Sequence, residues 1–374
     1  MKYFLIAGEP SGDMHAATLM AEIKNNDPQA EFQYFGGNLM QKQGGTLLMH
    51  YRNMAYMGIL PVLLNLRTIQ KNFRYAESQL LTFNPDILIL IDYPGFNLRM
   101  ARFAKNHNIK TAYYISPKVW AWKTKRVIKI KKYVDKMYTI FPFETDFYKR
   151  YNYPVTYVGN PVWDIIRKVN ESTANKEEFC RQNNLNDKPI IALLAGSRND
   201  EINLLLPVME EVAHGKKEYQ FVIAGAPGKD EEYYRQVLHK KLPIVFGQTY
   251  QLLKNSEAAI VASGTATLET ALLKTPQVVV YKMSMGWLLE KFRSVILKTK
   301  FFSLVNLVAE KEVVKELFQS QVTSENINDE LNKILLDTNY RSSIQKGYDD
   351  IIDKLHSEGA AIKAANHIVE SIKK

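Results

Sequence analysis

Two segments of the sequence combine small residues with groups that can hold a diphosphate. In LLAGSRNDEI an apolar run ends at Gly196 and Ser197, and Arg198 follows just before a helical pattern. An arginine here can neutralise a diphosphate through two parallel hydrogen bonds, and a helix N-terminus adds a favourable dipole. The alternative is a surface arginine paired with Asp200 or Glu201, and this segment alone does not decide between the two.

The second segment, VASGTATLET, runs from an apolar stretch into a helix through residues 263–266. Small residues let a phosphate approach the backbone, and the hydroxyls of Thr265 and Thr267 are candidate donors. Glu269, expected in the first helical turn, would accept hydrogen bonds from two ribose hydroxyls or simply balance the helix dipole. Two such segments in one half favour a nucleotide-diphosphate site. Its predicted residues are Gly196, Ser197, Arg198, Ser263, Gly264, Thr265, Ala266, Thr267 and Glu269.

A candidate general base lies in ILILIDYPGFNLRMA, which places Asp92 at the end of a continuous apolar run. Such a run is typical of a strand buried on both faces, and burial there would raise the pKa of the carboxyl toward the range useful for a base. The alternative is that Asp92 binds the turn before a helix at Phe96. Glu9, Asp13 and His15 are the other candidates, but the strand would hold Asp92 more rigidly.

Several motifs are missing from the sequence. It has no GxxxxGK[ST] loop, no GxGxxG, no His-x-His or Cys/His cluster and no Asp-x-Asp pair. These absences argue against a P-loop nucleoside triphosphatase and weaken a dehydrogenase interpretation. We therefore expect no metal and no cofactor, with Arg198 and the helix end assisting the departure of a diphosphate.

The positive charge is concentrated in the first half of the chain. Residues 1–165 hold 21 Lys or Arg and 12 Asp or Glu, and therefore nine of the ten excess positive charges. Residues 118–136 contain eight basic residues and one acid, which suits an anionic lipid, a phosphorylated substrate or an ordinary solvated helix. Residues 57–74 and 285–302 are basic and amphipathic, and either pack in a core or contact an anionic membrane surface. We find no nucleic-acid-binding motif and expect no nucleic acid.

The length and the pattern of apolar runs predict an α/β protein with two domains. At 374 residues the chain exceeds one ordinary core, and its single cysteine, Cys180, fits a reducing compartment. We find no signal peptide and no stretch of about 20 apolar residues. Short β-rich runs alternate with helical segments, as in doubly wound sheets. The expected strands are residues 2–8, 32–37, 86–92, 110–115, 136–141 and 155–160, then 189–196, 219–225, 243–247, 258–263 and 277–282.

We place the first Rossmann-like domain at residues 1–166 and the second at residues 167–341, with helical residues 342–374 joining the first. Two such domains facing a cleft are the layout of the GT-B glycosyltransferases. A two-domain dehydrogenase or a periplasmic-type binding protein would give a similar pattern.

The motifs together resemble those of the bacterial lipid-A-disaccharide synthase family. The similarity covers essentially the whole chain, in the family's order and spacing. The matching segments are AGEPSGD (7–13), AYMG (55–58), IDYPGFN (91–97), SPKVWAW (116–122), AGSR (195–198), SGTATLE (263–269) and SLVNL (303–307).

This resemblance implies an inverting GT-B hexosyltransferase of lipid A biosynthesis. Such an enzyme transfers 2,3-diacylglucosamine from UDP-2,3-diacylglucosamine to 2,3-diacylglucosamine 1-phosphate, and releases UDP. It also implies a peripheral protein at the cytoplasmic face of the inner membrane, whose oligomeric state stays open. Asp92 matches the expected base, Arg198 the diphosphate contact, and Glu269 and Asn306 positions near the nucleotide. One departure is Asn160, in a Gly-Asn-Pro sequence where the family more often has Gly-His.

The first loop, AGEPSGD, would then belong to the acceptor side. Glu9, Ser11, Gly12 and Asp13 are expected to bind sugar hydroxyls or to support Asp92, because both phosphate-binding segments lie in the other domain. Two alternatives are kept: another GT-B enzyme that uses UDP-N-acetylglucosamine, such as a peptidoglycan-type transferase or an epimerase, and a non-catalytic nucleotide-sugar or lipid-binding protein.

Overall fold

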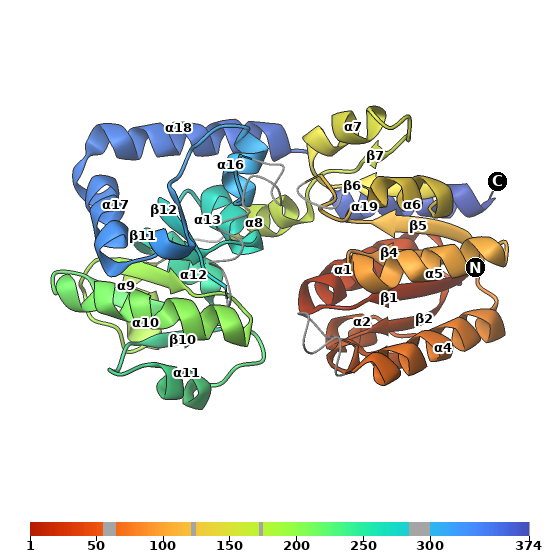
Figure 1. Cartoon of the computed structure of the whole chain (residues 1–374), viewed down its shortest axis with the longest axis horizontal. Helices are drawn as coiled ribbons and strands as arrows, with labels where there is room; N and C mark the ends of the chain where they lie inside the picture. The colour runs from red at the N-terminus through yellow and green to blue at the C-terminus, as the bar shows by residue number, and fades with distance from the viewer. Residues whose placement is uncertain (55–64, 121–124, 172–174, 284–299, 374) are drawn as a thin grey trace. The chain divides into compact units, whose positions relative to one another are not determined.

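The chain forms two compact α/β units in a computed structural model (Figure 1). Unit 1 comprises Met1–Pro161 and Ser357–Lys374, and unit 2 comprises Val162–His356. The structure describes residues 1–54, 65–120, 125–171, 175–283 and 300–373.

Unit 1 contains one parallel sheet with the strand order β3-β2-β1-β4-β5-β6-β7. Its central strands are buried at every position or nearly so, because helices cover both faces. Phe4, Ile6 and Leu90 point into a core formed with α4, α5 and α6, whereas α19 packs against α1. The strands are β1 (Lys2–Ala7), β2 (Glu31–Gly36), β3 (Thr46–His50), β4 (Ile87–Ile91), β5 (Lys110–Tyr114), β6 (Lys136–Thr139) and β7 (Thr156–Tyr157).

The helices of unit 1 follow the strands in the alternation that the sequence predicts. Three of them, α1, α5 and α7, begin with a proline within the first turn, where its missing N–H leaves no bond unmade. The helices are α1 (Pro10–Asn26), α2 (Asn38–Lys42), α4 (Leu66–Phe83), α5 (Pro94–Asn106), α6 (Arg126–Tyr133), α7 (Pro142–Lys149) and α19 (Ala360–Lys373), with a 3₁₀ turn η1 (Tyr51–Asn53).

Unit 2 repeats the architecture with the strand order β10-β9-β8-β11-β12-β13, again all parallel. Helix α10 packs against α17, and α18 packs against α13 and α16. The strands are β8 (Ile190–Leu194), β9 (Gln220–Gly225), β10 (Ile244–Phe246), β11 (Ser256–Ala262), β12 (Gln277–Tyr281) and β13 (Glu316–Phe318). The helices are α8 (Pro161–Glu171), α9 (Lys176–Gln182), α10 (Asn199–Gly215), α11 (Glu231–Val237), α12 (Thr249–Lys254), α13 (Thr265–Leu272), α16 (Leu304–Ala309), α17 (Ser324–Leu336) and α18 (Thr338–Leu355), with a 3₁₀ turn η2 (Gln319–Gln321).

The predicted α/β class is confirmed, and each of the eleven expected strands is present with different ends, the one expected at 155–160 being reduced to the two residues of β7. Two edge strands, β3 and β13, were not expected. The compact units also divide at other residues than those expected. Helix α18, which begins at Thr338, was expected to join the first domain from residue 342, but it belongs to unit 2. Tyr348 is buried there, and its hydroxyl donates to the carbonyl of Thr275 at 3.2 Å. Only residues from Ser357 onward return to unit 1.

Helix α7 begins over a buried carboxylate. Glu144 is 1% exposed, and its Oε2 accepts hydrogen bonds from the N–H groups of Ile140 and Phe141 at 3.1 and 3.0 Å. Its Oε1 accepts from the Trp120 indole at 3.2 Å. Burial raises the pKa of Glu144 to about 7, although these hydrogen bonds act in the opposite direction.

The raised pKa makes a prediction about stability against pH. The folded state retains the proton of Glu144 up to about pH 7, whereas the unfolded chain loses it near 4.5, so Glu144 stabilises the fold at low pH and loses that contribution as the pH rises. We expect the unfolding free energy of Glu144→Gln, relative to the wild type, to increase by about 3 kcal/mol between pH 4.5 and 7. Urea unfolding of both proteins across this range measures it, and a constant difference would contradict it.

Candidate active site

The order of the strands determines where the predicted residues meet. In both sheets the chain runs outward in one direction and then returns to the other side of the first strand, which creates a switch point between β1 and β4 and another between β8 and β11. Ligands of such sheets bind at the carboxyl ends of the strands at a switch point. Glu9 and Asp92 follow β1 and β4, while residues 196–198 and 263–266 follow β8 and β11. Each sheet therefore brings together the residues predicted within it.

Asp92 has an unusual backbone conformation at the end of β4. Its φ is +42° and that of Tyr93 is +46°, so two consecutive non-glycine residues lie in the left-handed region. Such a conformation costs about 1–2 kcal/mol per residue and persists only where surrounding contacts enforce it. The carbonyl of Asp92 accepts hydrogen bonds from the amide of Asn97 at 2.7 Å and from the hydroxyl of Tyr113. Together these contacts hold the aspartate where the strand ends.

The neighbouring strand β5 ends in the same way. Ile115, the residue after it, has a φ of +68°, which is rare for a β-branched residue. Its N–H donates to the carbonyl of Tyr138 at 3.1 Å, and its side chain is buried. Strained backbone at two adjacent strand ends, at Asp92 and at Ile115, marks this edge of the sheet as a candidate functional site.

Glu9 lies near Asp92, as the pairing of β1 with β4 requires. A side chain at Gly8 would collide with the ring of Tyr93 at 2.3 Å, so glycine is needed for this close approach. Burial, and then the charge of Glu9, raise the pKa of Tyr93 to about 12. Glu9 therefore lies beside the residue that follows Asp92.

The other predicted acceptor-side residues have structural roles. Asp13 is 3% exposed, and its carboxylate accepts hydrogen bonds from the N–H groups of Gly37, Leu39 and Met40 at 2.8, 3.0 and 3.1 Å, where α2 begins. The expectation that Asp13 binds a sugar hydroxyl was wrong, because its carboxylate is buried and already accepts hydrogen bonds from these three N–H groups. Ser11 is exposed in the first turn of α1.

Gly12 and His15 are buried in α1. A side chain at Gly12 would meet Ala7 at 3.4 Å, which is an ordinary van der Waals contact, so the helix packs on the sheet here without excluding a small side chain. Burial lowers the pKa of His15 to about 4, and the residue as a whole is 9% exposed. Because His15 is buried within α1, it is less accessible to a substrate than a residue at the end of a strand.

In unit 2 the first predicted loop begins at Gly196, whose φ of +99° favours glycine. Arg198 precedes α10, and its side chain is 57% exposed. Its guanidinium pairs with Glu201 at 3.2 Å, and the same carboxylate accepts hydrogen bonds from the N–H groups of Ser197 and Arg198 at 3.3 and 3.4 Å. Glu201 thus occupies the N–H groups that an anion would use.

The second loop crosses the same edge at the neighbouring strand β11. Ser263 donates through its hydroxyl to the carbonyl of Phe302 at 3.2 Å, and nothing lies within 4 Å of a side chain built at Gly264. Thr265 is exposed and Ala266 half-buried at the start of α13. Thr267 is fully buried and donates to the carbonyl of Gly264 at 2.8 Å, so the expectation that its hydroxyl is a phosphate donor was wrong.

Glu269 lies in the second turn of α13, not in the first, because the helix begins at Thr265. The hydroxyl of Tyr250 donates to its Oε1 at 3.3 Å. Burial raises the pKa of Glu269, and the hydrogen bond from Tyr250 partly offsets this. Tyr250 comes from α12, and the sequence contained no signal for this pair.

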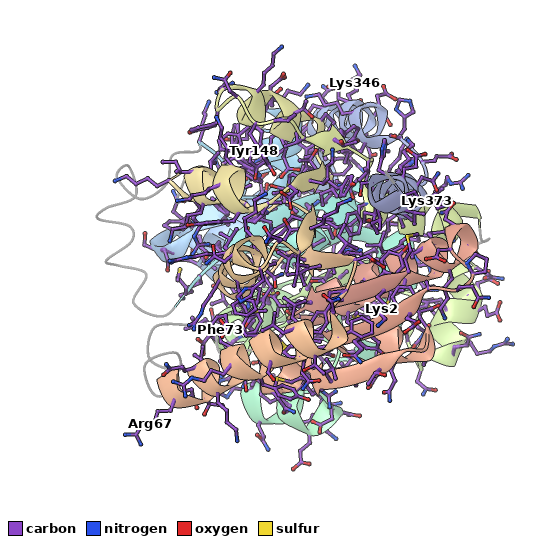
Figure 2. All side chains as sticks on the ribbon, turned by 90° about the vertical axis from the view of Figure 1, so that its right-hand side faces the viewer. Lys2, Arg67, Phe73, Tyr148, Lys346 and Lys373 are labelled. Atoms are coloured by element: carbon purple, nitrogen blue, oxygen red, sulfur yellow. The ribbon has the colours of Figure 1, made fainter. Side chains whose placement is uncertain are left out.

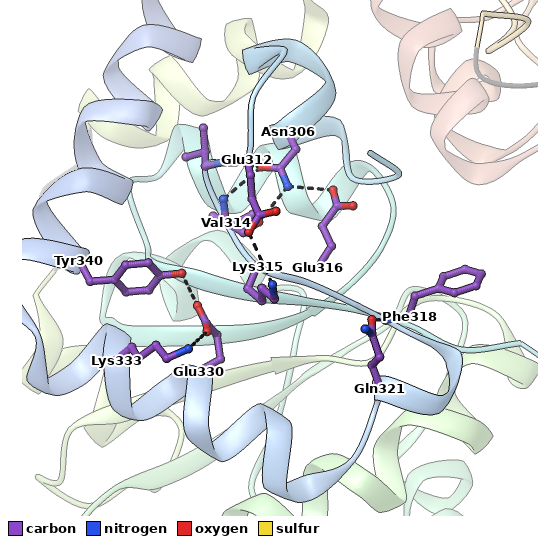
Figure 3. Close-up of polar contacts among 11 residues, drawn as sticks. Asn306, Glu312, Val314, Lys315, Glu316, Phe318, Gln321, Glu330, Lys333 and Tyr340 are labelled. Carbon is purple, nitrogen blue, oxygen red and sulfur yellow. Dashed lines mark hydrogen bonds and ion pairs between the residues drawn. The ribbon is translucent and has the colours of Figure 1, made fainter. Parts of the chain in front are cut away.

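Asn306 has no hydrogen-bonding capacity left for a nucleotide (Figure 3). Its side chain is fully buried; its amide donates to the carbonyl of Val314 at 2.8 Å and to Glu316 at 3.0 Å, and its oxygen accepts from the N–H groups of Val313 and Val314. The expectation of a direct nucleotide contact therefore conflicts with the geometry. Asn306 instead joins α16 to β13.

Other sequence expectations concern metals, membranes and basic segments. Within the described residues, no group of three or more His, Cys, Asp or Glu side chains is arranged to hold a metal ion, and none of the helices found there is long and apolar enough to cross a membrane. Residues 57–64 and 285–299 lie outside the described part of the chain. Helix α4 buries Phe73 against Phe96 and exposes Arg67 (Figure 2).

Comparisons with solved structures define the class of fold. The UDP-GlcNAc 2-epimerase from Neisseria meningitidis, solved with UDP-GlcNAc bound, superposes with a TM-score of 0.66 at 14% sequence identity, and the match covers 100% of both chains. The calicheamicin glycosyltransferase CalG4 gives a TM-score of 0.60 at 14% identity, covering 100% of this chain and 98% of that one. These neighbours, together with the two sheets, place the chain in the GT-B class of two Rossmann-like domains.

Comparisons of the amino-acid sequence identify the family to which the chain belongs. The model of the lipid-A-disaccharide synthetase family matches residues 3–371. The lipid-A-disaccharide synthase of Syntrophus aciditrophicus is 37% identical over 380 residues, covering 99% of this chain and 97% of the relative, and that of Coxiella burnetii (strain Dugway 5J108-111) is 38% identical over 349 residues, covering 91% and 90%. The chain belongs to the lipid-A-disaccharide synthetase family and is a hexosyltransferase of lipid A biosynthesis.

The assignment of Asp13 as a structural cap can be tested by its removal. Asp13→Ala leaves three N–H groups at the start of α2 without their acceptor, two of them in buried hydrogen bonds, so we expect the free energy of unfolding to fall by about 2–4 kcal/mol. Ser11→Ala, an exposed neighbour, should change it by less than about 0.5 kcal/mol. Equal stability of Asp13→Ala and wild type in urea unfolding would contradict the assignment.

Proposed function

We propose that the chain transfers 2,3-diacylglucosamine from UDP-2,3-diacylglucosamine to the 6-hydroxyl of 2,3-diacylglucosamine 1-phosphate. The products are the β-1,6-linked disaccharide 1-phosphate and UDP. Membership of the family supports these substrates. The strained, tightly held backbone at Asp92 is the observation that supports a reaction centre in unit 1.

Asp92 is the proposed general base. Its main chain is fixed by Asn97 and Tyr113, so the carboxylate is presented from a rigid strand end. Glu9 lies beside Tyr93 and is a second carboxylate at the same edge. We propose that Glu9 and the exposed Ser11 contact the acceptor sugar, while Asp13 and Gly12 support the loop from within.

Arg198 is the proposed contact for the diphosphate. In the structure its guanidinium pairs with Glu201, three residues further along the chain; the side chain of Arg198 is 57% exposed and that of Glu201 is 20% exposed. Because the arginine end of this pair is open to solvent, the pair contributes no more than about 1 kcal/mol, and a diphosphate with two negative charges can displace the carboxylate. The N–H groups of Ser197 and Arg198 would then be free to bind it.

Residues 263–266 are proposed to bind the same diphosphate from the neighbouring loop, where Gly264 leaves open space. Glu269, half-buried and bonded to Tyr250, is proposed to accept hydrogen bonds from the ribose. Asn306 acts indirectly by fixing the segment between α16 and β13.

The proposed reaction is a single displacement. Asp92 accepts the proton of the acceptor 6-hydroxyl as its oxygen attacks C1 of the donor sugar from the face opposite the diphosphate. The bond between C1 and the diphosphate oxygen breaks, and UDP leaves with the electron pair. Arg198 and the N-terminus of α10 neutralise the charge that develops on it, so no metal is required.

The acylated substrates suggest a location at a membrane. We propose that the protein associates peripherally with the cytoplasmic face of the inner membrane, through the basic surface of unit 1. In α6, Lys129, Lys131 and Lys132 are exposed, and Ile128 is 67% exposed among them.

Substitution of the two proposed reaction residues should lower turnover without unfolding the protein. Asparagine also tolerates left-handed backbone, so Asp92→Asn should keep the fold and reduce kcat by about 10²–10⁴ through loss of the base. Arg198→Gln should reduce kcat by about 10²–10³. Release of UDP and formation of disaccharide, followed with both acylated substrates, measure these effects.

The matched control is Arg181→Gln, which removes another exposed arginine from unit 2 and should leave kcat unchanged. Turnover like that of the wild type in Asp92→Asn or Arg198→Gln would refute the role given to that residue. Equal rates with unacylated UDP-N-acetylglucosamine would favour the other GT-B activities instead. Tight UDP binding without release of UDP from the donor would indicate a binding protein.

A further inference from the structure

Unit 1 contains a second feature that the proposed reaction has not used. A cavity of about 720 Å³ lies between the end of β3, the η1 turn and one side of α4. Its wall combines apolar and basic residues, and no acid is among the described residues that line it. Those that matter here are Leu47, Leu48, His50, Arg52, Lys71 and Tyr75.

Two cations of this cavity have no counter-ion among the residues that the structure describes. The side chains of Arg52 and Lys71 are exposed, and neither forms an ion pair or a side-chain hydrogen bond with any described residue. Elsewhere in unit 1, Lys105 pairs with Asp135 at 2.5 Å. Uncompensated guanidinium and ammonium groups in one concave site attract an anion, and a guanidinium binds a phosphate through two parallel hydrogen bonds.

The cavity lies on the edge of the sheet that carries Asp92. β3 is parallel to the other strands, so its carboxyl end faces the same way as that of β4. The two strands are three positions apart in the sheet, which corresponds to about 14 Å. A phosphorylated monosaccharide whose hydroxyl lies at Asp92 can therefore direct its phosphate toward the cavity.

Two hydrogen bonds connect the cavity to the residue next to Asp92. The hydroxyl of Tyr93 donates to the carbonyl of Met54 at 2.8 Å, at the end of the η1 turn. The amide of Asn72, on α4, donates to the carbonyl of Asn53 at 3.0 Å, and both asparagines line the cavity. The turn that carries Arg52 is thus held in a fixed relation to the proposed base.

We infer that Arg52 and Lys71 form the subsite for the phosphate of the acceptor, an acylated sugar phosphate, and that Leu47, Leu48 and Tyr75 contact its apolar part. This inference rests on the proposed function, because it takes the acceptor from that reaction. The same cations suit the phosphate of a membrane lipid headgroup, which has the same chemistry but a different source. We favour the acceptor because the two cations lie at the same edge of the sheet as Asp92. The base would face the hydroxyl of the acceptor, and the cations would face its phosphate.

The experiment compares two acceptors in detergent micelles without anionic lipid: 2,3-diacylglucosamine 1-phosphate and the same compound without its phosphate. We expect Arg52→Gln and Lys71→Gln each to raise KM about tenfold for the phosphorylated acceptor and to leave KM for the other unchanged. Arg67→Gln is the matched control, since Arg67 is exposed on the same helix α4 but does not line the cavity. It should change neither KM.

A second measurement distinguishes the two phosphate sources. Binding to vesicles of phosphatidylcholine with phosphatidylglycerol should change no more in Arg52→Gln than in Arg67→Gln. Weaker vesicle binding with an unchanged KM in detergent would assign the cations to the membrane and overturn the inference. An equal rise in KM for both acceptors would overturn it as well.

The inference can fail independently of the proposed function. If the wild type forms no disaccharide, the proposed function fails, and calorimetry of acceptor binding without donor still decides the role of the subsite. Binding that is about tenfold tighter with the phosphate, and loses this advantage in Arg52→Gln, supports the subsite. Binding that is indifferent to the phosphate refutes it.

Discussion

The order of the strands is the main constraint on this molecule, because it determines which loops meet. In each sheet the chain adds strands on one side of its first strand, β1 or β8, and then continues on the other side. In each sheet the loops after two neighbouring strands must leave in opposite directions, toward helices on different faces. Backbone groups are therefore left open at these two points, β1/β4 and β8/β11, and the residues predicted to do chemistry follow these strands. Glu9 and Asp92 follow the two strands of the first switch point, and Arg198 and Gly264 follow those of the second.

The polar residues around these edges divide into those that build the loops and those left for substrate. Asp13, Thr267 and Asn306 direct their polar atoms to backbone groups and are buried. Arg198 and Ser11 are exposed and make few contacts. Buried polar groups must be satisfied within the fold, so exposure is what separates a binding residue from a supporting one. Supporting residues keep the loops rigid, which a transfer reaction requires of its base.

Sequence reasoning located the loops well but assigned individual residues less reliably. Continuous apolar runs such as ILILI predict buried parallel strands, and the chain after each strand is then known to lie at one edge. The direction of a side chain within such a loop depends on contacts between distant segments, as with Asp13 and residues 37–40 or Asn306 and Glu316. No local pattern contains those contacts. The left-handed backbone at Asp92 and the pair of Tyr250 with Glu269 were likewise beyond a pattern of residue types.

The proposed function is an inverting sugar transfer that requires no metal, with Asp92 as the base and Arg198 as the contact for the diphosphate. The most direct test is nuclear magnetic resonance and mass spectrometry of the product formed in EDTA from UDP-2,3-diacylglucosamine and 2,3-diacylglucosamine 1-phosphate. The account predicts a β-1,6-linked disaccharide 1-phosphate and one UDP per linkage. An α-linked product, or UDP released without a disaccharide, would contradict it.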